Sequence, residues 1–432
     1  MRFALKMFAW LAGIVLLAAA IVFGVNQTDE PLSAEAEALL RMRKPPELGD
    51  RNGYPDLLAL RELAPNGRRI AECGVNHLGC VATPAGKVEF EALIAKHAEF
   101  LRRYRALRAK PEFIDPSVAD APDSAVPVYA DQIAGMRFVL IGSALRFQAG
   151  DQAGALEELQ AEAAFQRKAA EHARTLIQKM IGVAVLDELA VFAAELARRI
   201  PAENAALHAR LGAVVPEPTK AQLDVVPALD LERANIVEWM RTRKYVRLPD
   251  AVYEMFREFG EERKRPWWEP VAPWFYRPHY SVNLFAAKSG IANSVAHVPS
   301  TEFLGSVDTY WERAWALEPS GWKRWVLSPV SKEHYFLQVP RTTDYIARMY
   351  GHAGVQMLVR LQLQLRAAGT QKPEDVTAAL ADPKSPYRNP LTGKSFDFDV
   401  KTMTIGFPIE AKYVSGIGRK LRDAAGRISL PL

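Results

Sequence analysis

The sequence predicts a mainly α-helical fold: an irregular bundle of helical hairpins with a small C-terminal β-hairpin, preceded by an N-terminal transmembrane helix. Three observations predict it: an uncharged apolar run at the N-terminus, apolar side chains at helical spacing through much of the remaining chain, and a short alternating segment between turn signals near the C-terminus. Along the 432 residues we expect a cytoplasmic N-terminus over 1–6, a transmembrane anchor over 7–25, a loop-rich linker over 26–84, a helical domain over 85–212, a tryptophan- and proline-rich region over 213–340, and a long helix with a β-hairpin over 341–432.

Residues 7–25 predict a membrane-spanning helix, because a span needs about 20 mostly apolar residues. Arg2 and Lys6 precede this run, whereas Asp29 and Glu30 follow it. The positive-inside rule then places the N-terminus in the cytoplasm and the main body on the other side of the membrane. The high content of alanine, arginine and leucine indicates a bacterial source, so we expect the bilayer of a bacterial inner membrane as the partner of the helix and the periplasm as the compartment of the body. A cleaved secretory signal is the alternative, although the run is longer than a signal's apolar region and ends without an Ala-x-Ala-like site.

The overall charge gives no support to nucleic-acid binding. The formal net charge is +5, and 55 Lys and Arg residues are interspersed with 50 Asp and Glu residues. A nucleic-acid groove would need basic side chains clustered on one surface, so we expect no nucleic-acid partner. The part of the chain after the anchor is long enough for two or three hydrophobic cores.

The linker over 26–84 holds the two cysteines of the chain, Cys73 and Cys80. Proline and glycine punctuate most of this linker, which leaves one short helix near residues 34–42. Outside the cytoplasm a close cysteine pair usually oxidises, so we expect a disulfide here. Metal binding with His77 is one alternative, but a fourth ligand at a recognisable spacing is missing, and a pair of free thiols is the other.

The helical domain begins with Thr83-Pro84, a capping residue followed by proline at a first helical position. Apolar residues at helical spacing then predict one amphipathic helix over 85–108. His97 falls on the apolar stripe of this helix, where a hydrogen-bonded core histidine is a commoner arrangement than a metal ligand.

Three further helices are expected over 128–149, 153–172 and 175–200, with a break at Gly150-Asp151 between the first two. These first two read as a helical hairpin like one tetratricopeptide unit. The sequence holds no second good copy, so we expect a single hairpin rather than a solenoid. The helix over 175–200 is apolar on most faces, which predicts a buried central helix.

The rest of the chain combines tryptophan, proline and a C-terminal helix–strand pattern. Helices are plausible near 231–246 and 250–263, and seven of the nine tryptophans fall between residues 267 and 325. A long helix is expected over 342–368 and a short one over 373–380. A β-hairpin follows within 389–407, and the tail from Pro408 reads as a loop.

No catalytic motif stands out, and the catalytic residues stay unknown. The segment Gly393-Lys394-Ser395 lacks the glycine that a phosphate-binding loop has five residues earlier, because position 388 is arginine. Ser320 and Lys323 fit S-x-x-K, but the S-D-N and K-T-G elements of penicillin-binding proteins are missing from the sequence. We therefore expect no cofactor and no metal site. Four histidines could still converge in space: His279, His297, His334 and His352.

The stretch KRPWWEPVAPWFYRPHY, over residues 264–280, is the best functional lead. Tryptophan and tyrosine favour the membrane–water interface, and its basic residues suit anionic headgroups. A ligand groove is a second functional possibility, and a plug between helical subdomains is the structural alternative. The residues expected to contact membrane or ligand are Trp267, Trp268, Trp274, Phe275, Tyr276 and Tyr280.

Several short motifs occur in order between residues 50 and 290: Asn52-Gly53-Tyr54, the Cys73/Cys80 pair, FLRRYRAL at 100–107, QAGD at 148–151, LIQKMI at 176–181 and Phe275-Tyr276-Arg277-Pro278 leading to Asn283. In this order they resemble a group of uncharacterised, single-pass envelope proteins of proteobacteria. The segment NPLTGKSFDFDV at 389–400 is similar to a turn–hairpin after the long helix of pseudopilin-like bacterial proteins. In that family the long helix continues from the anchor, which it does not do here. Both resemblances imply location and fold, and neither implies an activity.

The expected function is that of a membrane-anchored periplasmic protein without enzymatic activity, a scaffold or interaction module that holds another protein of the cell envelope. The alternative is an envelope hydrolase whose site is assembled from distant parts of residues 213–340. A nucleophile–base pair or a carboxylate dyad in a pocket would favour this alternative.

Overall fold

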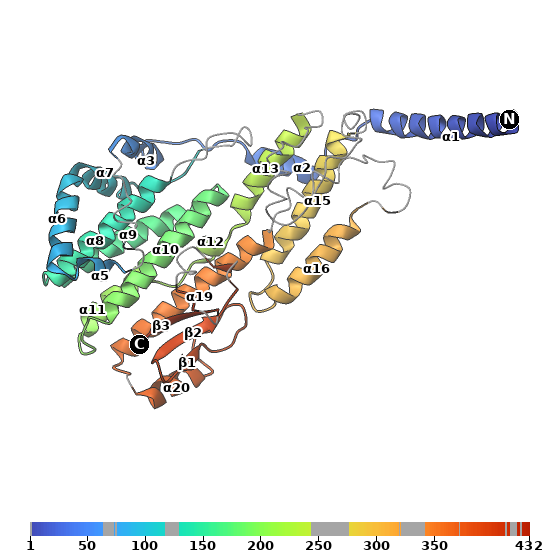
Figure 1. Ribbon diagram of the computed structural model, residues 1–432. Coiled ribbons are helices and arrows are strands. Elements are labelled where there is room, and N and C mark those ends of the chain that lie inside the picture. The colour runs from blue at the N-terminus through green and yellow to red at the C-terminus, as the bar shows by residue number, and fades with distance from the viewer. Residues whose placement is uncertain are drawn as a thin grey trace.

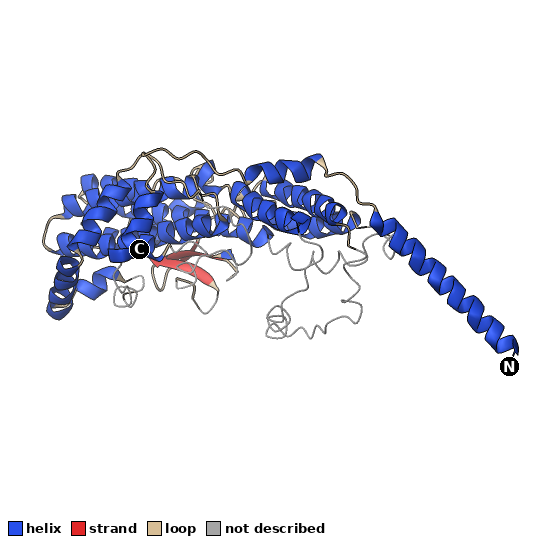
Figure 2. Cartoon of the chain, turned by 90° about the horizontal axis from the view of Figure 1, so that it is seen from above, coloured by secondary structure: helices blue, strands red, loops and turns tan. Residues whose placement is uncertain are grey.

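The structure is a computed structural model that describes residues 2–63, 73, 76–116, 129–242, 276–318, 320, 342–370, 372–410, 413–414, 421–423 and 426–432. The architecture is mainly helical with one small antiparallel sheet near the C-terminus, which confirms the predicted fold class at this level (Figure 1). Most helices pack side by side into an elongated body, and the first helix lies outside it (Figure 2).

Helix α1 (Arg2–Gln27) projects away from the body. Residues 6–27 reach a mean hydropathy of 2.5 and bury none of that apolar stretch against the protein. Large apolar side chains such as Phe8, Trp10 and Leu16 are therefore exposed along it. Helix α1 is long and apolar enough to cross a membrane. Among the described helices it is the one that meets both criteria of length and apolar composition.

The predicted loop-rich linker over 26–84 contains more helix than expected. The short helix near residues 34–42 is confirmed, and other short helices follow it. The prediction missed them because proline and glycine begin a helix here instead of interrupting one. Gly53 is the N-cap, and Pro55 lies in the first turn, where a backbone N–H would have no partner within the helix, so its absence in proline costs nothing. The elements are α2 (Ala34–Met42), α3 (Tyr54–Leu60), the 3₁₀ helix η1 (Arg61–Leu63) and α5 (His77–Val81).

The single helix predicted over 85–108 is wrong, because the chain bends at His97. Helix α6 (Pro84–Lys96) ends there and α7 (Ala98–Arg108) begins, and the backbone of His97 has φ −108° and ψ 26°. Its ring is half-buried and lies edge-on to Phe138, with 5.6 Å between the ring centroids. Both helices turn apolar side chains to the same core, so the apolar spacing continues across the bend and conceals it.

Helices α8 (Ala130–Gln148) and α9 (Gln152–Glu171) form the predicted helical hairpin. Gly150 makes the turn with φ +91°, a conformation that favours glycine, and the side chain of Asp151 accepts a hydrogen bond from the Gly154 amide at 3.0 Å. The likeness of this hairpin to a tetratricopeptide unit stays a prediction.

Helix α10 (Leu176–Ala197) is the buried central helix that the sequence predicts. It packs against α8, α9, α11 (Ala205–Val214) and α19 (Thr342–Ala367). A single hydrophobic cluster runs from α3 to the C-terminal sheet, so the regions predicted over 85–212 and 341–432 share a core.

A second, smaller hydrophobic cluster lies next to the anchor. Helix α2 packs against α13 (Val226–Thr242) and α15 (Pro278–Ala296), and the shared side chains include Leu39, Val237 and Phe285. The helix expected near 231–246 is present as α13, with shifted ends, whereas the one expected near 250–263 lies outside the described residues. The elements of this part are α12 (Lys220–Leu223), α13 (Val226–Thr242), α15 (Pro278–Ala296) and α16 (Phe303–Ala316).

The C-terminal region confirms both predicted helices, α19 (Thr342–Ala367) and α20 (Pro373–Ala381). The predicted hairpin is present as β1 (Asp397–Asp399) and β2 (Thr404–Pro408). The prediction of a loop for the whole tail is wrong, because β3 (Arg427–Pro431) pairs antiparallel with β2 in the order β1-β2-β3. Alternate residues of β3 are buried, which explains why this short segment joins the sheet.

Two glycines of α8 are expected to respond oppositely to alanine. A Cβ at Gly135 would lie 2.4 Å from two ring carbons of Tyr104, whereas at Gly142 the nearest atom is 3.8 Å away. Because Tyr104 is fully buried, Gly135→Ala should lower the free energy of unfolding by about 1–3 kcal/mol. Gly142→Ala should raise it by about 0.5–1 kcal/mol through helix propensity. Thermal unfolding of both variants in detergent measures the difference, and equal shifts would contradict the close packing at Gly135.

Candidate functional site

The aromatic residues expected to contact membrane or ligand fall into two groups. Trp267, Trp268, Trp274 and Phe275 lie outside the described residues. Tyr276 is 8% exposed, and its hydroxyl donates to the Met240 carbonyl at 3.3 Å, so this side chain belongs to the packing between α13 and α15. Burial raises the pKa of Tyr276 above its ordinary value. Tyr280 is half-buried at the first turn of α15, under the guanidinium of Arg277.

The start of α15 is bonded to the chain that leaves α1. One carboxylate oxygen of Asp29 accepts from the His279 amide at 2.7 Å, and the other accepts from the Tyr280 amide at 3.1 Å. Amides in the first turn of a helix have no partner within the helix, so Asp29 satisfies two of them from another part of the sequence. We call this contact between residues 29–33 and 277–283 the anchor junction.

Side chains on both sides strengthen the anchor junction. Asn283 donates to a Glu30 carboxylate oxygen at 2.7 Å and to the Pro31 carbonyl at 2.9 Å, while its own oxygen accepts from the Ser33 amide at 2.7 Å. Arg277 lies 3.9 Å from carboxylate oxygens of Asp29 and Glu30. Since α1 ends at Gln27, the junction fixes the body within a few residues of the anchor.

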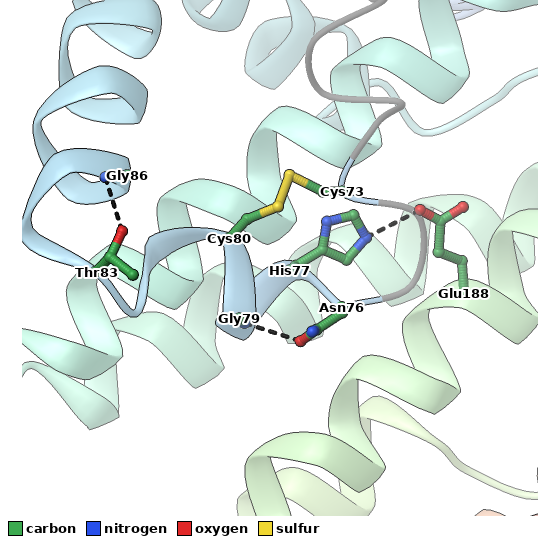
Figure 3. The surroundings of a disulfide bond; sticks show 8 residues. All are labelled: Cys73, Asn76, His77, Gly79, Cys80, Thr83, Gly86 and Glu188. Carbon is green, nitrogen blue, oxygen red and sulfur yellow. Dashed lines mark hydrogen bonds and ion pairs between the residues drawn. A yellow bond between two sulfur atoms is a disulfide. The ribbon is translucent and has the colours of Figure 1, made fainter.

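The disulfide prediction agrees with the structure, in which Cys73 and Cys80 are paired with 5.8 Å between their Cα atoms. Figure 3 shows the pair beside α5, with the Asn76 side chain accepting from the Gly79 amide at the start of this short helix. The ring of His77 is directed at Glu188 of α10, and its Nε2 lies 3.0 Å from Oε1 of that carboxylate (Figure 3).

Glu188 joins three segments inside the core. It is 3% exposed, and Arg137 of α8 donates to its two oxygens at 3.0 and 3.2 Å. Burial raises the pKa of Glu188, but the hydrogen bonds from His77 and Arg137 outweigh it and hold the pKa below the ordinary value. Glu188 therefore holds the disulfide loop and α8 against the central helix.

A cavity of about 300 Å³ lies between α5, α10, α19 and the C-terminal strand. Its polar lining includes Asn76, Glu195, Arg198, Gln362 and Ser429. Apolar side chains of α10 and of the sheet form the remaining walls, among them Val191, Ala194, Leu430 and Pro431. Pockets of this size are in the lower range for small-molecule sites.

Two lining residues of this cavity have a buried oxygen that lacks a hydrogen-bond partner among the described residues: Oε2 of Glu195 and Oε1 of Gln362. Gln362 is fully buried, and its amide nitrogen donates to the Pro431 carbonyl, which leaves the oxygen as its remaining polar atom. Burial raises the pKa of Glu195 above its ordinary value. The effects of His77, the Leu78 amide and two neighbouring arginines lower this pKa, but burial outweighs them. A carboxyl with a raised pKa in a cavity marks a candidate functional residue.

A buried histidine–carboxylate pair lies nearer the start of α10, on the same face of this helix. His352 of α19 approaches Asp187 with 2.6 Å between Nδ1 and Oδ1, and Gln356 donates to the Leu186 carbonyl at 3.1 Å. The small cavity beside His352 has room for about one water, and its described lining contains no serine, threonine or cysteine that could act as a nucleophile. We assign this pair to holding α19 against α10.

The described histidines do not converge into one site. His279 and His297 lie at opposite ends of α15, so about 27 Å separates them along the helix. His352 is bound to Asp187, and His334 lies outside the described residues. In the parts of the chain that the structure describes, no three His, Cys, Asp or Glu side chains are arranged to hold a metal ion. Residues 243–275 and 321–341, which make up much of the expected hydrolase region, are outside these parts.

Sequence reasoning missed the cavity and its two unpartnered acceptors. Glu195 shares α10 with Asp187 and Glu188, and three carboxylates in a helix that is apolar on most faces were the available signal. Burial of a carboxylate needs a partner, so such residues point to an ion pair or to a site. Gln362 gave no comparable signal, since glutamine is common in exposed helical positions.

The resemblances to envelope proteins and to pseudopilin-like proteins stay predictions, since comparison with protein-family models, with curated proteins and with solved structures found no match.

Proposed function

We propose that this chain is a single-pass membrane protein of the bacterial cell envelope, whose periplasmic body acts as a scaffold or interaction module without enzymatic activity. Helix α1 supports the membrane part of the proposal, because its apolar surface is unburied and long enough to span a bilayer. Arg2 and Lys6 lie at the N-terminal end of α1, before its apolar stretch, and no Lys or Arg follows closely after Gln27, which favours an N-terminus in the cytoplasm.

The anchor junction is the observation that carries the scaffold role. It ties the body to the chain two residues after α1 ends, through hydrogen bonds of Asp29, Glu30 and Asn283. A freely linked body would need no such contacts. Their presence supports a body held at a set position on the membrane surface, where it can present its helices to another envelope protein.

The aromatic stretch before Tyr276 fits this arrangement. Trp274 is three residues from Arg277, so the chain allows at most about 11 Å between them. Arg277 is itself part of the anchor junction. A tryptophan attached this close to the anchor is within reach of the membrane–water interface, which supports lipid contact by Trp274, with Trp267 and Trp268 in the same stretch of sequence. The helical hairpin α8–α9 is the element that we propose for holding a partner, in the manner of a tetratricopeptide unit.

Reporter fusions test the location. An enzyme that is active only in the periplasm, fused after Leu432, should be active in the full-length chain, and a cytoplasmic reporter at the same point should be inactive. Mild cross-linking in cells followed by purification should then recover the chain with a defined envelope protein. The opposite reporter pattern would overturn the orientation, and recovery of the cross-linked chain alone would contradict the scaffold role.

Removing the Asp29 carboxylate tests the anchor junction. Asp29→Ala leaves two amides of α15 without their acceptor, so the free energy of unfolding should fall by about 1–2 kcal/mol. Limited proteolysis should also cleave the chain faster between α1 and α2. Asp50→Ala is the control, because Asp50 is exposed and the acceptor that it offers to Lys110 is its main-chain carbonyl. Equal proteolysis of both variants would show that the junction does not restrain the linker.

A further inference from the structure

Two exposed apolar side chains lie close together in the sequence at the end of α16. Trp315 is in the last turn of this helix and is 44% exposed, and Leu317 directly follows the helix and is 40% exposed. Ala316 between them is exposed as well. Single exposed apolar residues are normal on a protein surface, whereas a contiguous group points to contact with another molecule or with a membrane. We call residues 315–317 the α16 end.

The α16 end is held against the middle of α15. The Lys288 ammonium donates to Glu318 at 2.7 Å and lies 5.3 Å from the centre of the Trp315 ring. Lys288 comes eight residues after Tyr280, so about 12 Å separates the two along the helix. The Tyr280 amide donates to Asp29 in the anchor junction. The α16 end therefore lies near the place where the body is tied to α1.

The α16 end also lies on the side of the body that faces the anchor. Figure 1 shows α16 ending on the side from which α1 projects, and α15 running across the direction of α1. Burial raises the pKa of Tyr280, and the carboxylates of Glu30 and Glu318 raise it further, so residues that follow α1 and α16 approach the same side chain. Because α15 runs across the anchor, the distance from Tyr280 to Lys288 extends mostly along the surface of a bilayer that α1 crosses. The α16 end thus lies at a height close to that of the anchor junction.

The chemistry of the α16 end suits a phospholipid interface. Indole rings favour the boundary between hydrocarbon and headgroups, where one part of the ring stays hydrated, and a leucine beside the indole gains from leaving water. The charges around the α16 end balance. Exposed Glu312 is next to exposed Arg313. Lys288 is paired with Glu318. We therefore expect the contact to depend on apolar burial and not on anionic headgroups.

We propose that the α16 end lies in the membrane–water interface of the bilayer that α1 crosses, and that Trp315 and Leu317 contact its phospholipids. A body attached at one point is free to tilt against the bilayer. A second contact at the α16 end removes this freedom, so the body always presents the same helices to a partner. This inference rests on the membrane location proposed above, and separate labels distinguish the failure of one from the failure of the other.

The experiment uses the full chain in phosphatidylcholine vesicles, with one fluorescent label at a time. Both native cysteines form the disulfide, so an added cysteine is the thiol that takes the label. Leu317→Cys places the label at the α16 end, and Leu17→Cys reports whether α1 lies in the bilayer. Val88→Cys is the matched control, because Val88 is an exposed apolar residue of α6, at the far end of the body from α1 (Figure 1). Lipids that carry a nitroxide on the headgroup or deep in the acyl chain quench labels at the corresponding depth.

The Leu317 label should be quenched at least about twofold more by headgroup nitroxides than the Val88 label, because the interfacial layer is only about 5–7 Å thick on each side of the hydrocarbon. Adding phosphatidylglycerol should not change this difference. Trp315→Ala should reduce the quenching at Leu317, whereas Leu304→Ala, at an exposed residue at the other end of α16, should leave it unchanged.

Equal quenching at Leu317 and Val88, with Leu17 quenched by the deep nitroxide, would overturn the second contact and leave the anchor in place. An unquenched label at Leu17 would overturn the membrane location itself. Quenching at Leu317 that appears only with anionic lipid would also contradict the proposal, since it would show a contact through charge. The comparison of labels does not need Trp315→Ala, so it holds even where that variant is poorly folded.

Discussion

Replacing Glu162 with alanine is expected to lower the free energy of unfolding by about 2–4 kcal/mol, because a buried phenol loses its carboxylate acceptor and the buried Arg108 keeps only Glu158 as a carboxylate partner among the described residues. Glu162 lies on α9 and is fully buried. One carboxylate oxygen accepts from the Tyr104 hydroxyl at 2.7 Å, and the other accepts from Arg108 at 2.9 Å. Thermal and denaturant unfolding of the detergent-solubilised chain, followed by circular dichroism, measure the change.

The polar network around Glu162 explains the size of this effect. Gln166 donates to the same Glu162 oxygen at 2.7 Å and to the Tyr104 hydroxyl at 3.0 Å. Its own oxygen accepts from Gln132 at 2.7 Å. Burial raises the pKa of Tyr104 well above its ordinary value, so the phenol stays protonated and continues to donate. The network thus links α7, α8 and α9, and removing its central acceptor affects all three helices.

Matched variants separate lost charge pairing from lost packing. Glu157→Ala is the control on the same helix, because Glu157 is exposed, and its effect should stay within about 0.5 kcal/mol. Adding Arg108→Met to Glu162→Ala should recover part of the loss, since no buried arginine is then left without that acceptor. A loss below about 1 kcal/mol in Glu162→Ala would contradict the interpretation of this site as a buried ionic network.

Apolar periodicity predicted the long helices well. Helix α19 begins at the predicted residue and ends one residue earlier, and α10 follows the predicted range closely. Both helices turn most of their side chains to the core, so each carries a strong local signal. The bend at His97 was not predicted, because neither glycine nor proline marks it and because the apolar stripe continues through it.

Contacts between distant parts of the chain were beyond sequence reasoning. Strand β3 holds two buried residues, Ile428 and Leu430, which is too short a pattern to distinguish from a loop until β2 is known to lie beside it. The anchor junction joins residues about 250 positions apart. Its members, Asp29 and Asn283, are ordinary surface residue types, and only the fold brings them together. The cavity depends in the same way on α10, α19 and β3 meeting.

Lys179 provides a second expected effect, on the pH dependence of stability. This residue of α10 is 1% exposed, and its ammonium donates to the Ala170 and Ala221 carbonyls, each at 2.9 Å. Burial lowers its pKa from 10.5 to about 8, although Asp224 and Glu171 act in the opposite direction. Lys179 therefore connects the end of α9 to α12 through its ammonium group. The folded protein releases the proton of this group more easily than the unfolded chain does.

Between about pH 8 and pH 10.5 the unfolded chain holds the Lys179 proton more tightly than the folded protein does. Stability must then rise with pH across this window, by at most about 3 kcal/mol from this group. Lys179→Met removes the contribution, so the difference in unfolding free energy between wild type and variant should grow in favour of the wild type from pH 8 to pH 10.5. Lys96→Met, at an exposed lysine of α6, should leave the pH profile unchanged. A constant difference between wild type and Lys179→Met would mean that the buried ammonium keeps its proton throughout, held by the two carbonyls strongly enough to offset its burial.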